Sequence, residues 1–197
     1  MGNAEHILGD LNELSDASRR AGLATLLVNL LTPEDEALDK TTAFFRENVN
    51  ALHQRMKGIA NWLIATDETH SLDIGYFGVG VSAAAALAAA ALRPDAVHAI
   101  VAVAPRIDLI REYLPRIVTP TLLIVAERDT QALDMSHKAS AELTSDTTLD
   151  NVREVRERGL PHTLEPIPGV ANVFENEQSL QKVEQLAIWW FTYHLSV

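Results

Sequence analysis

Two apolar runs with few polar positions constrain the fold more than any other feature of this chain. The stretches Val97 to Ala104 and Pro120 to Ala126 consist mainly of valine, isoleucine, leucine and alanine. A strand of that composition has no face suited to water, so both of its faces must be covered. Helical patterns separate these runs from other apolar runs, as in a parallel sheet between two layers of helices. We therefore predict the α/β class, with a mostly parallel sheet in a three-layer sandwich.

The spacing of apolar residues predicts the remaining elements. A continuous run from Leu23 to Leu31 (LATLLVNLL) predicts a further buried parallel strand. From Thr41 to about Thr66 the apolar residues step by four and three, which predicts one long amphipathic helix. The other predicted elements are a first helix from Leu11 to Ala21, a strand from Asp73 to Gly78, a helix from Ser82 to Leu92, a helix from about Leu133 to Leu143, a strand from Thr163 to Ile167 and a terminal helix from Leu180 to Phe191.

Length and charge limit the classes of function. With 197 residues, 47% of them hydrophobic, the chain can bury one core, so we expect a single domain spanning 1–197. Its formal net charge of −11 disfavours nucleic acid and anionic membranes as partners. It has no cysteine and no signal-like start, and we expect a soluble, cytoplasmic protein. The charged stretch from Ser145 to Gly159 predicts an inserted loop or helix with a solvated face.

A strand, a glycine-rich turn and an alanine-rich helix follow one another from Ile74 to Asp95 (IGYFGVGVSAAAALAAAALRPD). This string resembles the nucleophile elbow of the dienelactone hydrolases, a family of α/β-hydrolases. AGLATLLVNLLTPEDE, PTLLIVAERD and IPGVANVFE resemble further segments of that family in the same order, so the resemblance extends from about Leu11 to the end. It implies an α/β-hydrolase-like domain that is shortened at its amino terminus and lacks the first strands of the sheet.

The resemblance places a glycine where the family has its nucleophile. In the elbow motif G-x-S-x-G, a serine stands on a sharp strand-to-helix turn. Aligned without gaps, the motif falls on Gly78 to Ser82 and its central serine on Gly80, which has no side chain. Glycine adopts positive φ without a Cβ penalty, so the turn can persist after the nucleophile is lost.

Other interpretations of this turn are open. Sliding the motif by two residues makes Ser82 the nucleophile of a G-x-S-x-A string, whereas a simpler interpretation makes Ser82 an amino-terminal helix cap. The residues Gly78 to Ala83 also fit the dinucleotide-binding pattern G-x-G-x-x-A. The acidic residue expected about 20 positions later is missing, since Asp95 comes too early and Asp108 too late. The amides of the turn could still hold a small anion.

The resemblance also locates the other catalytic positions of the family. Asn172, in the loop after the last predicted strand, occupies the histidine position, and a carboxamide cannot act as a general base. Asp129 retains the position of the triad acid and can equally cap the helix that follows. The family's HGSGSS-like oxyanion loop has no counterpart in Met1 to Asp10, which could add at most one short strand.

No histidine is expected to replace the lost base. His162 begins the final predicted strand, roughly 16 Å from the carboxyl edge of the sheet at about 3.3 Å per strand residue. His98 opens a strand, and His53, His137 and His194 belong to helices. No spacing of histidines and carboxylates matches a metal motif, so we expect neither a metal nor a cofactor.

These observations predict a catalytically degenerate hydrolase-like protein that acts as a binding or assembly module and could hold a small ligand in the former cleft. The alternatives are a weak carboxylic-ester hydrolase using Ser82 and a nucleotide- or anion-binding module at Gly78 to Ser82. Exposed strand edges invite partners, so the missing strands predict a homodimer or a protein complex at the shortened side of the sheet.

Overall fold

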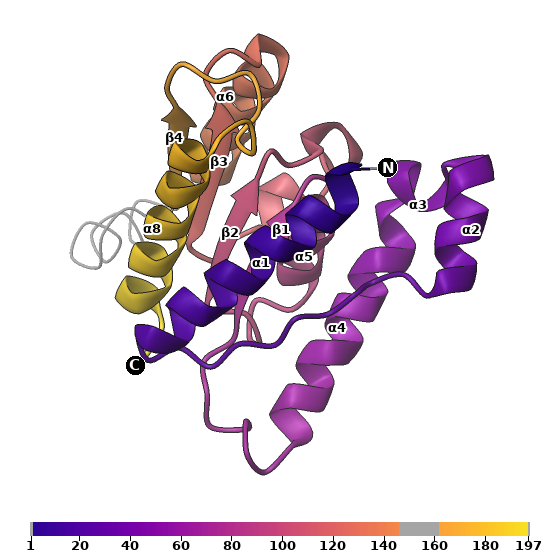
Figure 1. The fold of residues 1–197 in the computed structure, drawn as a ribbon. Coiled ribbons are helices and arrows are strands. Elements are labelled where there is room, and N and C mark those ends of the chain that lie inside the picture. The colour runs from indigo at the N-terminus through magenta and orange to yellow at the C-terminus, as the bar shows by residue number, and fades with distance from the viewer. Residues whose placement is uncertain (1, 146–161, 197) are drawn as a thin grey trace.

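Residues 2–145 and 162–196 are described by a computed structural model of the chain. They contain a four-stranded sheet in the order β1-β2-β3-β4, in which every neighbouring pair is parallel (Figure 1). The strands are β1 (Gly75–Val79), β2 (Ala99–Val103), β3 (Thr121–Ala126) and β4 (His162–Ile167). The sheet is therefore parallel, as the apolar runs predict.

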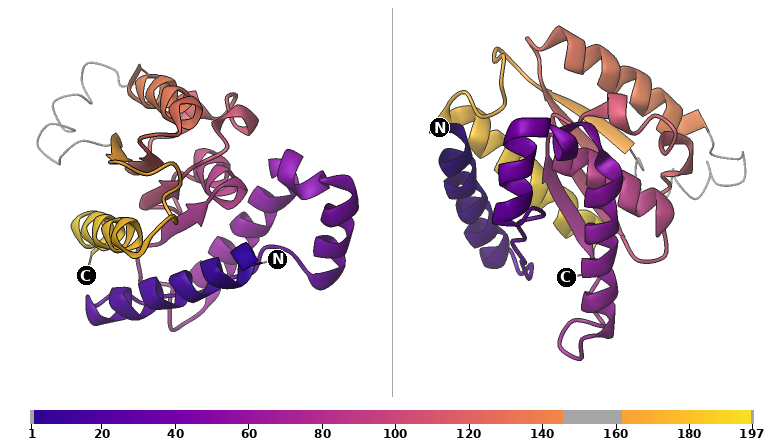
Figure 2. Two further views of the ribbon diagram at one scale, coloured as in Figure 1. Left: turned by 45° about the horizontal axis from the view of Figure 1, so that its top comes forward. Right: turned by 90° about the vertical axis from the view of Figure 1, so that its right-hand side faces the viewer.

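Helices cover both faces of this sheet, and the views in Figure 2 show the layers. Because side chains alternate along a strand, Ile100 and Ala102 point into one core cluster, and Val101 and Val103 into the other. The predicted three-layer sandwich is confirmed. One layer of helices holds α4 (Val49–Ala65), α5 (Val81–Leu92) and α6 (Thr130–Ser145). The other layer holds α1 (Gly2–Arg20) and α8 (Glu177–His194). Two short 3₁₀ helices, η1 (Ile107–Leu109) and η2 (Leu114–Arg116), lie in the connection from β2 to β3.

Helix α5 packs close to the sheet because its buried side chains are small. Eight of its nine buried residues are alanines, and the ninth is Leu87. A Cβ atom added to Gly78 in β1 would lie 2.7 Å from the backbone N and Cα of Ala83. The alanines of the helix and the glycine of the strand thus permit a contact that larger residues would block.

The run from Leu23 to Leu31 is not a strand, and that prediction is wrong. It forms an irregular, extended connection between α1 and α2 (Pro33–Thr42), visible in Figure 1. Leu26, Leu27 and Val28 are 52%, 51% and 46% exposed. An apolar run becomes a strand only where another strand edge pairs with it, and none of the described strands pairs with this one.

The single helix predicted from Thr41 to Thr66 is broken in two places. Helix α2 ends at Thr42, and the chain turns at Ala43, whose φ of 56° lies in the left-handed region. Helices α3 (Phe44–Glu47) and α4 follow, separated by the extended residue Asn48. The predicted apolar stripe is therefore shared by short helices and continues mainly along α4.

A buried carboxylate accounts for the first break. Asp39 Oδ1 accepts hydrogen bonds from the backbone N–H of Phe45 at 2.7 Å and of Arg46 at 3.1 Å. Its Oδ2 accepts a third bond from Arg46 Nε at 2.8 Å. These bonds satisfy amides at the start of α3 that no preceding helical turn can satisfy. Side-chain bonds to the backbone compete with a continuous helix, and apolar spacing does not report them.

The amino-terminal residues form a helix rather than a strand. Helix α1 begins at Gly2, so the residues of Met1 to Asp10 that are described, all but Met1, add no strand, within the limit of one short strand set by the sequence. Of the charged stretch from Ser145 to Gly159, only Ser145 is described, as the last residue of α6, and the rest lies outside the described residues. None of the described helices has the length and apolarity of a membrane span.

Candidate functional site at the carboxyl edge of the sheet

The predicted site positions lie at one edge of the sheet. All four strands are parallel, so their carboxyl ends share an edge, which is where ligands bind in open α/β sheets. Gly80 directly follows β1, Asp129 comes three residues after β3, and Asn172 lies in the loop after β4. The fold thus collects at one edge the positions that the family resemblance implies.

Gly80 forms the corner between β1 and α5. Its φ of 60° and ψ of −120° are disfavoured for residues with a side chain. The Gly80 N–H donates to the carbonyl of Val103 at 2.9 Å, and its carbonyl accepts from the N–H of Ala84 at 3.2 Å. A Cβ on Gly80 would meet no atom within 4 Å. The corner is therefore held by backbone bonds and leaves open the space where a side chain would stand.

Ser82 lies inside the first turn of α5. The cap position of this helix is Gly80, so the interpretation of Ser82 as the amino-terminal cap is wrong. The reason is that the sharp turn comes two residues earlier, which leaves Ser82 in helical conformation. Among the described residues no hydrogen bond joins the Ser82 hydroxyl to a histidine.

Asp129 caps the helix after β3, as the sequence allows. Its Oδ1 accepts a hydrogen bond from the N–H of Ala132 at 3.0 Å, in the first turn of α6. The side chain is exposed. An N-terminal cap of this kind contributes about 1 kcal/mol to stability, so Asp129 has a structural role in this fold whether or not it takes part in catalysis.

Two hydrogen bonds join the loop after β3 to the loop after β4. Glu127 Oε2 accepts from the N–H of Gly169 at 2.7 Å, and the N–H of Arg128 donates to the carbonyl of Val170 at 3.0 Å. These bonds bring the segment before Asp129 against the segment before Asn172. The role of Glu127 was not predicted from the sequence, where its only signal is a carboxylate at the end of an apolar strand.

Asn172 organises its own loop. Its Oδ1 accepts a hydrogen bond from the N–H of Phe174 at 2.9 Å. Glu175, also overlooked in the sequence, accepts from the N–H of Ala171 at 2.8 Å through Oε2. Short local bonds of this type are typical of asparagine in turns. The residue at the family's histidine position thus has a turn-forming role in this structure.

The side chain of Arg106, whose backbone bonds to the corner, is paired with carboxylates. The N–H of Arg106 approaches the carbonyl of Gly80 at 3.4 Å. Its Nη2 lies 2.7 Å from Asp108 and 3.4 Å from Glu47. The hydrogen bonds from Arg106 lower the pKa of Asp108, and the Asp108 carboxylate raises the pKa of Arg106. This guanidinium is therefore committed to carboxylates and is poorly placed to attract an anion to the turn.

The histidines lie away from this edge or inside helices. His162 is the first residue of β4 and pairs in register with Thr121, the first residue of β3, at the amino end of the sheet. His98 precedes β2, where its Nδ1 accepts from the N–H of Ile74 at 3.2 Å. His53, His137 and His194 lie in α4, α6 and α8. In the described residues no group of three or more histidine and carboxylate side chains could hold a metal ion.

His162 makes stability depend on pH. It is 8% exposed, its Nδ1 has no partner among the described residues, and burial lowers its pKa from 6.5 to about 4. Between these two pH values the unfolded chain binds a proton at His162 that the folded chain does not. The contribution of the neutral His162 to the free energy of unfolding is therefore fully present above about pH 6.5 and is lost as the pH falls toward 4. The expected loss is about 3 kcal/mol at most.

Urea unfolding at pH 7 and pH 4.5 measures this effect. The wild type and His137→Gln, which alters an exposed histidine of α6, should both lose stability at the lower pH. His162→Phe should lose clearly less. An equal loss in all three proteins would contradict the assignment to His162.

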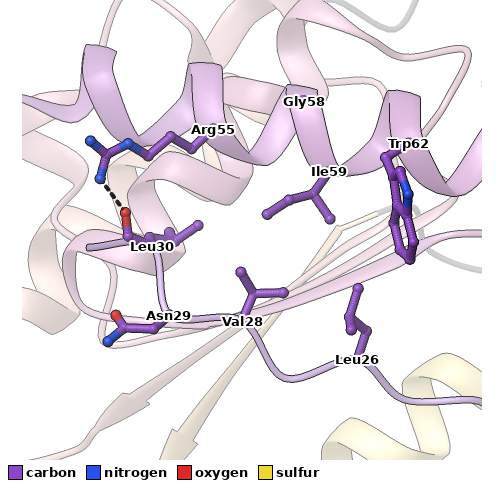
Figure 3. A pocket seen from close by; sticks show the side chains of 8 residues that line it. All are labelled: Leu26, Val28, Asn29, Leu30, Arg55, Gly58, Ile59 and Trp62. Carbon is purple, nitrogen blue, oxygen red and sulfur yellow. Dashed lines mark hydrogen bonds between the residues drawn. The ribbon is translucent and has the colours of Figure 1, made fainter. Parts of the chain in front are cut away.

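A cavity lies elsewhere, between the extended connection and α4 (Figure 3). It has a volume of about 330 Å³. Arg55 borders it and donates a hydrogen bond to Asp35 at 2.7 Å. The lining contains none of the residues predicted for the site, and it consists of Leu26, Val28, Asn29, Leu30, Arg55, Gly58, Ile59 and Trp62.

Comparison with known proteins gives relatives of two kinds. No family model matches the chain. A solved structure, the dienelactone hydrolase from Anabaena variabilis, is 35% identical with a TM-score of 0.82, and the match covers 95% of this chain and 80% of that one. Two curated relatives from strains of Mycobacterium tuberculosis, each named "Putative phosphoribosyl transferase", are 37% identical over 175 residues. That match covers 89% of this chain but 35% of each relative, so the chain spans about a third of their length.

Proposed function

The chain belongs to the dienelactone hydrolase family, and from that premise we propose that it is a catalytically degenerate member that acts as a binding or assembly module. The observation that carries the proposal is Gly80, which stands at the strand-to-helix corner with a φ of 60° and has no atom that could attack a substrate. The missing base supports it, because the amide of Asn172 cannot take up a proton near neutral pH.

The retained acid does not rescue catalysis. A triad aspartate acts by orienting a histidine, and Asp129 instead accepts a hydrogen bond from the N–H of Ala132. Loss of a nucleophile and of a base each reduces the rate of such enzymes by several orders of magnitude. A chain without both is expected to show no ester hydrolysis above background.

An assembly role agrees with the size of the curated relatives. Each of these proteins is about three times as long as the matched segment, so in them this kind of domain accompanies other sequence. Their name concerns phosphoribosyl transfer, which needs a site for a phosphate-bearing sugar. The guanidinium of Arg106, whose backbone N–H bonds to the carbonyl of Gly80, is already paired with Asp108 and Glu47. We therefore do not assign phosphoribosyl transfer to this chain.

A weak ester hydrolase using Ser82 is the second candidate. The intermediate exposure of Ser82 favours it, since a reagent could reach the hydroxyl. The anion- or nucleotide-binding alternative at Gly78 to Ser82 ranks third, and a thermal shift of the folded chain with NAD would detect it.

Labelling with a fluorophosphonate probe separates the first two candidates. Such probes react covalently with activated serines and leave ordinary serines unmodified. We expect no labelled band for the wild type or for Ser82→Ala, beside an active serine hydrolase as the positive control. Labelling of the wild type that disappears in Ser82→Ala would overturn the proposal in favour of the hydrolase.

A further inference from the structure

We propose that the contact between the first half of α4 and the crossover of residues 104–120, which joins β2 to β3, is an acid-sensitive switch that loosens when His53 binds a proton. Asn50 and His53 form this contact from α4, and Tyr113 forms it from the crossover. The switch goes beyond the proposed function and does not depend on the loss of catalysis, so an active hydrolase could contain it as well.

Two hydrogen bonds to one oxygen atom join α4 to the crossover. Asn50 Oδ1 lies 3.2 Å from Nε2 of His53 and accepts from the Tyr113 hydroxyl at 3.1 Å. An amide oxygen can only accept, so Nε2 of His53 carries a hydrogen atom. The rings of His53 and Tyr113 also meet edge to face, with their centroids 5.8 Å apart. The contact therefore holds the neutral imidazole that is protonated on Nε2.

The other ring nitrogen of His53 has no acceptor for a second proton. His53 is 3% exposed, and its buried Nδ1 has no hydrogen-bond partner among the described residues. A protonated Nδ1 would be a buried, charged donor without an acceptor, which is a costly arrangement. Burial accordingly lowers the pKa of His53 below its usual value of 6.5. Proton binding thus favours a conformation in which Nδ1 reaches water.

The charged groups around His53 give the imidazolium no support. Lys57 lies one turn further along α4, and its positive charge also lowers the pKa of His53, after the larger effect of burial. Helix α5, which packs along α4, contains no titratable residue. The charged side chains of α3 and the crossover are exposed or engaged in ion pairs, and they are those of Arg46, Glu47, Arg106, Asp108, Arg111, Glu112 and Arg116.

Loosening this contact would alter one flank of the candidate site. Helix α4 follows α3 after Asn48 alone, and Glu47 of α3 pairs with Arg106 of the crossover. The backbone N–H of Arg106 bonds in turn to the carbonyl of Gly80 at the corner. Side-chain contacts thus join α3 and α4 to the crossover beside the corner, and His53 supplies one that depends on pH.

The apolar contacts of the crossover limit the change to a local one. Ile110 and Leu114 are at most 1% exposed and belong to the core cluster on the α4 and α5 side of the sheet. These side chains do not titrate, so the core that they share persists at low pH. We therefore expect local loosening at moderately acid pH rather than unfolding of the chain.

Hydrogen exchange of the backbone amides, followed by mass spectrometry at pH 7 and pH 5 and corrected for the intrinsic effect of pH, tests the proposal. In the loosened state His53 regains its usual pKa, so each pH unit below 6.5 can raise the population of that state by up to about tenfold. We expect the protection of residues 49–57 and 106–117 to fall by about threefold or more at pH 5, and that of α8 to fall less.

Three variants assign this change to His53. His53→Phe keeps an aromatic ring but cannot bind a proton, so the local response to pH should disappear. Tyr113→Phe keeps its ring and loses the hydrogen bond to Asn50, so the same two segments should exchange faster already at pH 7. The matched control His137→Gln alters an exposed histidine of α6 and should respond as the wild type does.

Circular dichroism verifies that each variant is folded, and NMR titration of the His53 ring in the wild type gives a second measurement that needs no variant. Its pKa should lie below 6.5, and a higher value would overturn the proposal. Protection that is unchanged at pH 5, or that falls equally in α4 and α8, would also overturn it. A local response that persists in His53→Phe would do the same, by assigning the effect to another group.

Discussion

Replacing Gly78 by alanine is expected to destabilise the protein by about 3 kcal/mol, at the upper end of the usual range for overpacking. The added Cβ would lie 2.7 Å from the N and Cα atoms of Ala83 and 2.8 Å from the carbonyl carbon of Ser82. These are backbone atoms, so relief requires β1 or α5 to move. Urea unfolding at neutral pH measures the change in the free energy of unfolding.

Gly80→Ala is the matched control for this substitution. It adds the same methyl group two residues away, where no atom lies within 4 Å, so only the backbone conformation, with φ of 60° and ψ of −120°, is unfavourable. We expect a loss of about 1 to 2 kcal/mol there. A Gly78→Ala variant as stable as Gly80→Ala would show that α5 does not pack against β1 as closely as described.

Replacing Trp190 by alanine is expected to destabilise the protein by about 3 to 5 kcal/mol. Trp190 is 1% exposed and packs in the cluster between α8 and the sheet. Its indole Nε1 has no hydrogen-bond partner among the described residues, so the loss comes from packing and from the cavity left behind. Thermal and urea unfolding report the change.

The neighbouring tryptophan provides the control. Trp189 is 50% exposed and stacks on Tyr193, with ring centroids 6.2 Å apart. Trp189→Ala should change stability by about 0.5 kcal/mol or less, as surface substitutions do. Equal losses for the two variants would contradict the orientation of α8 on the sheet.

The sheet and its helices were predictable because a strand that is buried on both faces requires apolar residues at nearly every position, and such a run can be recognised in the sequence. Strands β2 and β3 are buried at every position, and they appear in the sequence as uninterrupted apolar runs. The run from Leu23 to Leu31 has the same composition but no strand beside it. Strand formation depends on a partner that the local sequence does not contain, so composition alone predicted one strand too many.

The candidate site was predictable in its positions and less so in its contacts. The resemblance to the elbow motif of the family placed the turn, and the structure has the corner at Gly80. The bonds from Glu127 to Gly169 and from Asp39 to Phe45 join residues through side chains whose targets no periodicity encodes. Asp129 could be placed after a strand, and its capping bond to Ala132 agrees with one of the two roles considered.

We propose that the chain retains the strand-to-helix turn of a hydrolase at Gly80 but lacks the nucleophile and the base that hydrolysis requires. Steady-state hydrolysis of small aryl acetates by the folded wild type, Ser82→Ala and Asp129→Asn tests it most directly. The account predicts that all three proteins release the phenol at the rate of buffer alone. Turnover by the wild type that exceeds this background and is lost in both variants would contradict it.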